Sequence, residues 1–175
     1  EKVKLTKTGF IRYLMDEIDW KDRMIGIKGA RGVGKTTMLL QYIKTRLQNE
    51  KVLYVSLEDL YFSKNSLYAM AEEFTKQDGK YLFVDEVHRY PDWAKELKLV
   101  YDDFPFLQIV YTGSSILDTS KARADLSRRA VVYSMQGLSF REYINFTKKQ
   151  DLRDYSLEQM LEDHIQIADV INDNL

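Results

Sequence analysis

The chain has 175 residues, of which 45% are hydrophobic and 30% are charged, and 26 basic against 27 acidic side chains give a formal net charge of -1. This composition is ordinary for one globular domain with a buried core, and the charge balance excludes a global attraction to nucleic acid or to an anionic membrane. The chain has no cysteine, which excludes disulfides and cysteine-based zinc sites and agrees with a cytoplasmic location. No apolar run approaches the roughly 20 residues of a bilayer span, so we expect no membrane partner.

The apolar spacing predicts an alternation of helices and strands along the chain. Helices are expected over 9–20, from Lys35 onward, over 66–76 and over 91–104. Strands are expected over 23–28, 51–57, 80–86, 106–112 and 130–135. Capping-box patterns at 139–142 and 156–159 indicate two further helices. This alternation indicates βαβ units, and hence an α/β fold whose parallel sheet is covered by helices on both faces.

Residues 29–36 satisfy the phosphate-loop pattern G-x-x-x-x-G-K-[ST] and lie between a predicted strand and a predicted helix. Glycines let successive N–H groups point at phosphate oxygens, and the helix adds its positive N-terminal end. Lys35 can reach the β- and γ-phosphates, and Thr36 offers a hydroxyl to Mg²⁺. The predicted nucleotide-binding residues are Gly29, Ala30, Arg31, Gly32, Val33, Gly34, Lys35, Thr36 and Thr37.

Two acids end the predicted strand over 80–86. We expect Asp85, together with Thr36, to hold Mg²⁺, and Glu86 to act as general base toward the attacking water. The second acid favours hydrolysis over a kinase reaction, which needs no base aimed at water. Thr-Lys-x-Asp at 75–78 resembles a guanine-reading signature, but it precedes the acidic strand, so adenine and hence ATP are favoured.

Five further polar residues are candidates for contacts with the γ-phosphate. Ser114, with Thr112 as second choice, could align the water, although both residue types are also ordinary turn formers. Arg128 or Arg129 could stabilise transition-state charge at a neighbouring subunit, and solvated arginines at a strand edge are the alternative. His88 could sense the γ-phosphate, or it could be a structural hydrogen-bonding histidine.

With these residues in hand, the chain resembles the AAA+ branch of P-loop ATPases. More narrowly, it is similar to a bacterial and archaeal family of AAA-domain ATP-binding proteins that usually carry an uncharacterised C-terminal domain. The matching stretches are GARGVGKTTML, YLFVDEVHRYPDWAKELKLVYD, IVYTGSS and LSRRAVVYSMQGLSFREY.

The resemblance implies a P-loop NTPase sheet of five parallel strands in the order 5-1-4-3-2, with Mg-ATP at the carboxyl ends of the strands. It places Arg129 at the family's arginine before the last strand, with Arg128 adjacent. A homo-oligomer in which Arg129 or Arg128 is supplied in trans is a possible arrangement. Where the family reads Leu-Ala-Gly-Arg, this chain reads Asp-Leu-Ser-Arg-Arg-Ala, so both arginines stay candidates.

Family members are usually much longer than this chain. We therefore expect residues 1–150 to be the AAA+ ATPase domain with its N-terminal helix, and 151–175 to be the helical start of a truncated C-terminal region. The domain that follows in the family would bind a protein or nucleic-acid partner. The favoured function is ATP hydrolysis coupled to such a partner, ahead of a nucleotide-gated interaction switch with little turnover and of a P-loop kinase.

Overall fold

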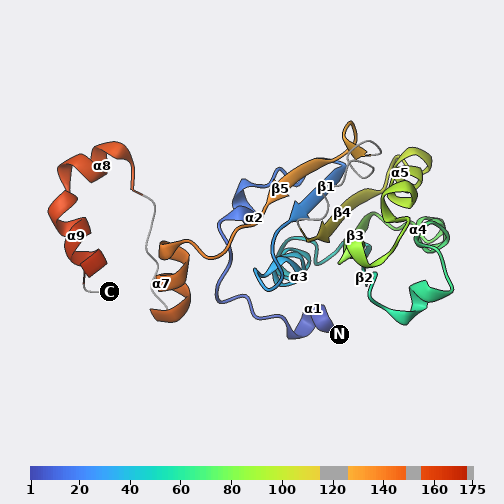
Figure 1. The fold of residues 1–175 in the computed structure, drawn as a ribbon, viewed down its shortest axis with the longest axis horizontal. Coiled ribbons are helices and arrows are strands. Elements are labelled where there is room, and N and C mark those ends of the chain that lie inside the picture. Colours follow the sequence, from blue (N-terminus) through green and yellow to red (C-terminus); the bar gives the residue numbers. More distant parts are fainter. Residues whose placement is uncertain (115–125, 149–154, 173–175) are drawn as a thin grey trace. The chain divides into compact units, whose positions relative to one another are not determined.

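Five strands form one parallel sheet in the order β2-β3-β4-β1-β5 (Figure 1). The computed structural model describes residues 1–114, 126–148 and 155–172. The strands are β1 (Met24–Lys28), β2 (Val52–Ser56), β3 (Tyr81–Asp85), β4 (Gln108–Gly113) and β5 (Val131–Ser134). Read from β5, this is the expected order 5-1-4-3-2, and every strand pair is parallel. The predicted α/β fold and its strand order are therefore confirmed.

Apolar side chains alternate along the strands, so they form two hydrophobic cores, one on each face of the sheet. On one face, Phe83 of β3 packs in a cluster with Leu39 of α3 (Lys35–Arg46) and Leu14 of α2 (Leu14–Glu17). On the other face, Leu82 of β3 packs with Leu97 and its neighbours from α4 (Leu67–Lys76) and α5 (Trp93–Asp103). Helices therefore cover both faces, and the central strands are buried. Short 3-10 turns, η1 (Leu60–Ser63) and η2 (Val87–Arg89), follow β2 and β3.

The predicted helix over 9–20 is wrong. The structure has only α1 (Lys2–Leu5) and the single turn α2 in this region. Side chains of α3 bind backbone carbonyls of α1 and of the segment that follows it: Gln41 Nε2 donates to the oxygens of Lys7 and Phe10, and Lys44 Nζ to those of Lys4 and Thr6. These bonds hold the chain before α2 along α3 in a non-helical path. The apolar spacing is instead satisfied by burying Leu14, Met15 and Ile18 against the sheet.

The chain divides into two compact units, Glu1–Gly137 and Leu138–Leu175. The second unit contains α7 (Phe140–Lys148), α8 (Leu157–Glu162) and α9 (His164–Asn172). Both predicted capping boxes are present: the backbone N–H of Ser139 donates to the Glu142 carboxylate at 2.9 Å, and the reciprocal bond is 3.2 Å. Ser156 and Gln159 bond in the same way at 2.9 and 3.2 Å. The domain boundary expected at 150–151 lies outside the described residues, so it stays a prediction.

None of the helices in the described ranges combines the length and the apolar character that a bilayer span requires.

Candidate functional site

The loop between β1 and α3 depends on its three glycines. Gly32 and Gly34 have φ of +84° and +101°, in the left-handed region that L side chains rarely adopt. Gly29 is needed for a different reason, because a Cβ there would lie 2.3 Å from the backbone oxygen of Met135, just after β5. The loop can therefore curl at Gly32 and Gly34 while it lies directly against the chain that leaves β5. Ala30, Arg31, Gly32 and Thr37 are exposed, and Val33 is half-buried.

Lys35 is the first residue of α3 and is only 5% exposed. Its ammonium donates to the backbone oxygens of Gly29 and Ala30, each at 2.9 Å. Both acceptors are neutral carbonyls of the loop that the lysine closes. An anion in the loop would offer this buried charge an ionised acceptor, which makes a stronger hydrogen bond. The first N–H groups of α3 have no partners within the helix and add a positive end at the same place.

Asp85, the last residue of β3, is 2% exposed and accepts four hydrogen bonds. Its Oδ2 accepts from Thr36 Oγ1 at 2.6 Å and from the Tyr54 hydroxyl at 2.8 Å. Its Oδ1 accepts from Thr112 Oγ1 and from the backbone N–H of Glu86 at 3.1 Å. Thr112, the second choice for a γ-phosphate contact, is thus fully buried and directed at Asp85. The predicted pair Thr36 and Asp85 does come together.

Glu86 follows β3 with φ of 54°, a left-handed conformation that is uncommon for a non-glycine residue. Its backbone N–H also lies 3.2 Å from Thr112 Oγ1, and its carboxylate lies 3.3 Å from His88 Nδ1. The same Nδ1 lies 3.5 Å from the backbone nitrogen of Ser114. One nitrogen can either donate to Glu86 or accept from Ser114, but not both. His88 therefore lies between the two predicted residues, and the buried Ser114 Oγ has no hydrogen-bond partner among the described residues.

The two arginines before β5 lie at the amino ends of the strands, opposite the carboxyl ends where the glycine loop and Asp85 lie. All strands are parallel, so residues that precede β5 are at the amino edge, whereas the loop and Asp85 follow carboxyl ends. Arg129 forms a two-pronged ion pair with Asp102 of α5, at 2.8 and 2.9 Å, and these hydrogen bonds lower the pKa of the Asp102 carboxyl. Arg128 is exposed. The structure therefore does not bring either arginine to the loop of its own chain.

Two residues of the site are absent from the sequence-based prediction. Arg12, 6% exposed, donates to the oxygen of Val33 at 2.7 Å and to those of Gln136 and Gly137 at 2.9 and 3.0 Å. It thus ties the glycine loop to the chain after β5. Tyr54 is the second, and burial together with the Asp85 carboxylate raises its pKa well above the usual value, so the phenol keeps the proton that it donates. The feature that relates Tyr54 to Asp85 is the register of β2 with β3. Ser56 pairs with Asp85, and Tyr54 lies two residues before Ser56 on the same face of the strand.

The residues present fit a magnesium-bound nucleotide. The loop offers a glycine cradle, a buried ammonium and a helix N-terminus, which together suit polyphosphate. Within the ranges that the structure describes, no group of three or more His, Cys, Asp or Glu side chains could hold a metal on its own. A cation bound by Thr36 and Asp85 would depend on phosphate oxygens and water for its other ligands, which is the coordination that Mg²⁺ prefers.

Comparison with known proteins gives a family and a fold. A family model described as "AAA domain" matches residues 21–144. An uncharacterised protein of Methanocaldococcus jannaschii is 32% identical over 155 residues, covering 83% of this chain and 32% of that protein. The chain thus spans about a third of the length of this curated relative.

Two solved structures share the fold. AMPPCP-bound DnaA from Aquifex aeolicus has a TM-score of 0.51 at 16% identity, over 85% of this chain and 53% of DnaA. PCH-2 from C. elegans also has a TM-score of 0.51, at 18% identity over 77% of this chain and 41% of PCH-2. At these identities the likeness concerns the fold alone.

Proposed function

This chain belongs to the AAA domain family, and on that premise we propose that it binds Mg-ATP at loop 29–36 and hydrolyses the terminal phosphate. The observation that carries the proposal is the 2.6 Å bond between Thr36 and Asp85, which joins the start of the loop helix to the end of β3. A cation that bridges nucleotide phosphates to the sheet would meet both side chains there. That DnaA binds an ATP analogue agrees with this proposal.

In this proposal Lys35 exchanges its two loop carbonyls for β- and γ-phosphate oxygens, and the glycine loop supplies N–H donors. The bound Mg²⁺ would neutralise phosphate charge. Glu86 would draw the proton from the attacking water, with Ser114 helping to align that water. Glu86 reaches this role only when its carboxylate is free of His88, 3.3 Å away.

The transition-state arginine would come from another copy of the chain, because Arg128 and Arg129 lie at the edge opposite the loop. Arg129 would have to exchange Asp102 for a neighbour's phosphate, whereas the exposed Arg128 has no such cost. An isolated chain should therefore hydrolyse ATP slowly, and its turnover number should rise with protein concentration.

A nucleotide-gated interaction switch with little turnover is the second candidate. It is favoured by two ion pairs within the chain, Glu86 with His88 and Arg129 with Asp102. Both proposed catalytic side chains are held by these partners, and neither is available for hydrolysis until its pair opens. A turnover number that stays constant with protein concentration, together with a partner affinity that changes on ATP binding, would favour the switch. The partner, a protein or a nucleic acid, would be bound by parts that longer relatives have beyond this length.

Calorimetry with Mg-ATP tests the binding step. Lys35→Ala should weaken affinity about thirtyfold, which corresponds to about 2 kcal/mol for a charge-assisted hydrogen bond. Lys95→Ala is the matched control, because Lys95 is exposed on α5, outside the loop. Equal affinities of the wild type and Lys35→Ala would refute the proposed site.

A further inference from the structure

Tyr54 holds a position that the proposed function does not use. It lies on β2, the edge strand, and its ring packs against the cluster that joins α3 to the sheet. Its hydroxyl crosses to the next strand and donates to Asp85 Oδ2 at 2.8 Å. We infer that Tyr54 is a positioning residue for the magnesium site, which fixes the Asp85 carboxylate from the edge-strand side. This inference rests on the proposed function.

The hydrogen bonds of Asp85 show what Tyr54 adds. An ionised carboxylate has about four lone-pair positions, and Asp85 receives four donors, two on each oxygen. Thr112 and the Glu86 N–H hold Oδ1. Thr36 and Tyr54 hold Oδ2, the oxygen that faces the start of α3. Since the Thr36 oxygen is itself a proposed metal ligand, Tyr54 is the donor on Oδ2 that has no other task. It therefore keeps Oδ2 in place when Thr36 turns to the cation.

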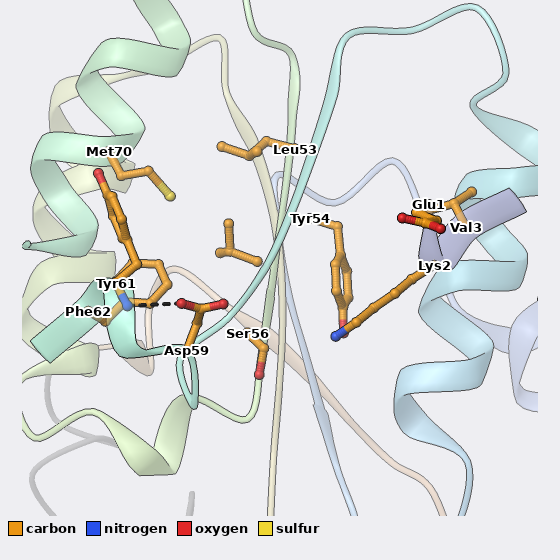
Figure 2. A pocket seen from close by; sticks show the side chains of 11 residues that line it. Glu1, Lys2, Val3, Leu53, Tyr54, Ser56, Asp59, Tyr61, Phe62 and Met70 are labelled. Carbon is orange, nitrogen blue, oxygen red and sulfur yellow. Dashed lines mark hydrogen bonds between the residues drawn. The ribbon is translucent and has the colours of Figure 1, made fainter. Parts of the chain in front are cut away.

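The surroundings of Tyr54 show that its hydrogen bond matters for its position. Figure 2 shows the ring between β2 and α1, with the Lys2 side chain extending toward it, while Leu53 points to the opposite side. The Lys2 ammonium lies 6.0 Å from the ring centroid. A cavity of about 790 Å³, which Tyr54 lines, extends along β2 and leaves the ring half-buried. Because the ring is only half-buried, packing alone holds it incompletely, and the bond to Asp85 fixes its hydroxyl end.

Nucleotide affinity measured as a function of Mg²⁺ tests the inference on the folded chain. Tyr54→Phe keeps the ring and removes one donor from Asp85. We expect the Mg²⁺ concentration that gives half-maximal enhancement of ATP affinity to rise about tenfold, the usual loss when a residue that orients a metal ligand is changed. ATP affinity in EDTA should stay within about twofold of the wild type, because the loop and Lys35 are untouched.

Tyr68→Phe is the matched control. The Tyr68 hydroxyl also donates to a carboxylate, Asp103 of α5 at 2.9 Å, but on the surface of the other helix layer. This variant should titrate with Mg²⁺ as the wild type does, and thermal unfolding of both variants checks that they fold.

Three results would overturn the inference. A Tyr54→Phe titration that superimposes on the wild type shows that the hydroxyl does not act on the metal. A shift to lower Mg²⁺ shows that it competes with the metal, and an equal loss of affinity in EDTA and in Mg²⁺ shows a merely structural role. If Tyr54→Phe does not fold, Tyr54→Leu, which also lacks a hydrogen-bond donor, is titrated under the same criteria. A wild type without Mg²⁺-dependent ATP binding refutes the proposed function instead, so the two failures are distinguishable.

Discussion

Replacing Gly29 by alanine tests whether the glycine loop is held against the end of β5. The new Cβ would lie 2.3 Å from the Met135 backbone oxygen, and side-chain carbons essentially never approach closer than 3.0 Å. The loop must therefore move by at least 3.0 − 2.3 = 0.7 Å. Neither side can yield easily, because Met135 N–H is bonded to the Lys28 oxygen at 2.7 Å and Gly29 N–H to the Gly113 oxygen at 3.3 Å.

We expect two effects of Gly29→Ala. Overpacking of this kind typically costs about 1–3 kcal/mol, which urea unfolding measures as a lower midpoint. A displacement of the phosphate loop by most of an ångström should also weaken Mg-ATP binding by more than about tenfold, since misplacement by about 1 Å can cost about a hundredfold in an active site.

The control for this prediction is Gly137→Ala. A Cβ at Gly137 meets nothing within 4 Å and its backbone φ is not in the left-handed range, so both stability and affinity should stay near those of the wild type. If Gly29→Ala unfolds at the wild-type urea concentration and binds Mg-ATP equally well, the close approach of the loop to Met135 is not a constraint.

Three further predictions follow from the same geometry. Glu86→Gln should slow single-turnover ATP hydrolysis by about 10²–10⁴-fold while Mg-ATP affinity stays unchanged, and undiminished hydrolysis would reject Glu86 as the base. Arg12→Met leaves three carbonyl oxygens without their donor and should lower the free energy of unfolding by about 3 kcal/mol, whereas the exposed Arg31→Met should not; equal urea midpoints would contradict this. Because Arg129 lowers the pKa of folded Asp102 below the ordinary 3.8, their ion pair stabilises the fold above that pH and is lost as the pH falls through the lowered value. The stability difference between wild type and Asp102→Asn should accordingly shrink below about pH 4 in acid titrations followed by circular dichroism, and a constant difference would exclude the linkage.

The parts of the fold that were predictable from the sequence depend on neighbours along the chain. The strand β3 is an apolar run that ends in Asp85, and the glycine loop is a continuous pattern between a strand and a helix. Likewise, Ser66 caps α4 through the Ala69 N–H, a bond that spans three residues. In such cases the group that stabilises an element is present in the same short stretch, so the pattern carries the answer.

The parts that could not be predicted depend on partners far along the chain. The segment over 9–20 has helical spacing, yet the carbonyl of Phe10 accepts a hydrogen bond from Gln41, 31 residues further along the chain. Arg12 reaches Gln136, 124 positions away, and Tyr54 reaches Asp85, 31 positions away. Neither residue type has a marked signal for such a bond, because arginine and tyrosine occur on many helix faces and strands. Only the register of the assembled sheet makes these contacts evident.

If an arginine acts in trans as proposed, the placement of Arg128 and Arg129 at the amino ends of the strands, opposite the loop, sets how copies of the chain would meet. One copy would present its arginines to the next copy's loop, so the two surfaces in contact differ and the contact is heterologous. Such a contact has a direction, and a pair made this way completes only one of its two pockets. Every pocket would be complete only in a closed ring, while a rotation that fails to close would give a helical filament with one unfinished end.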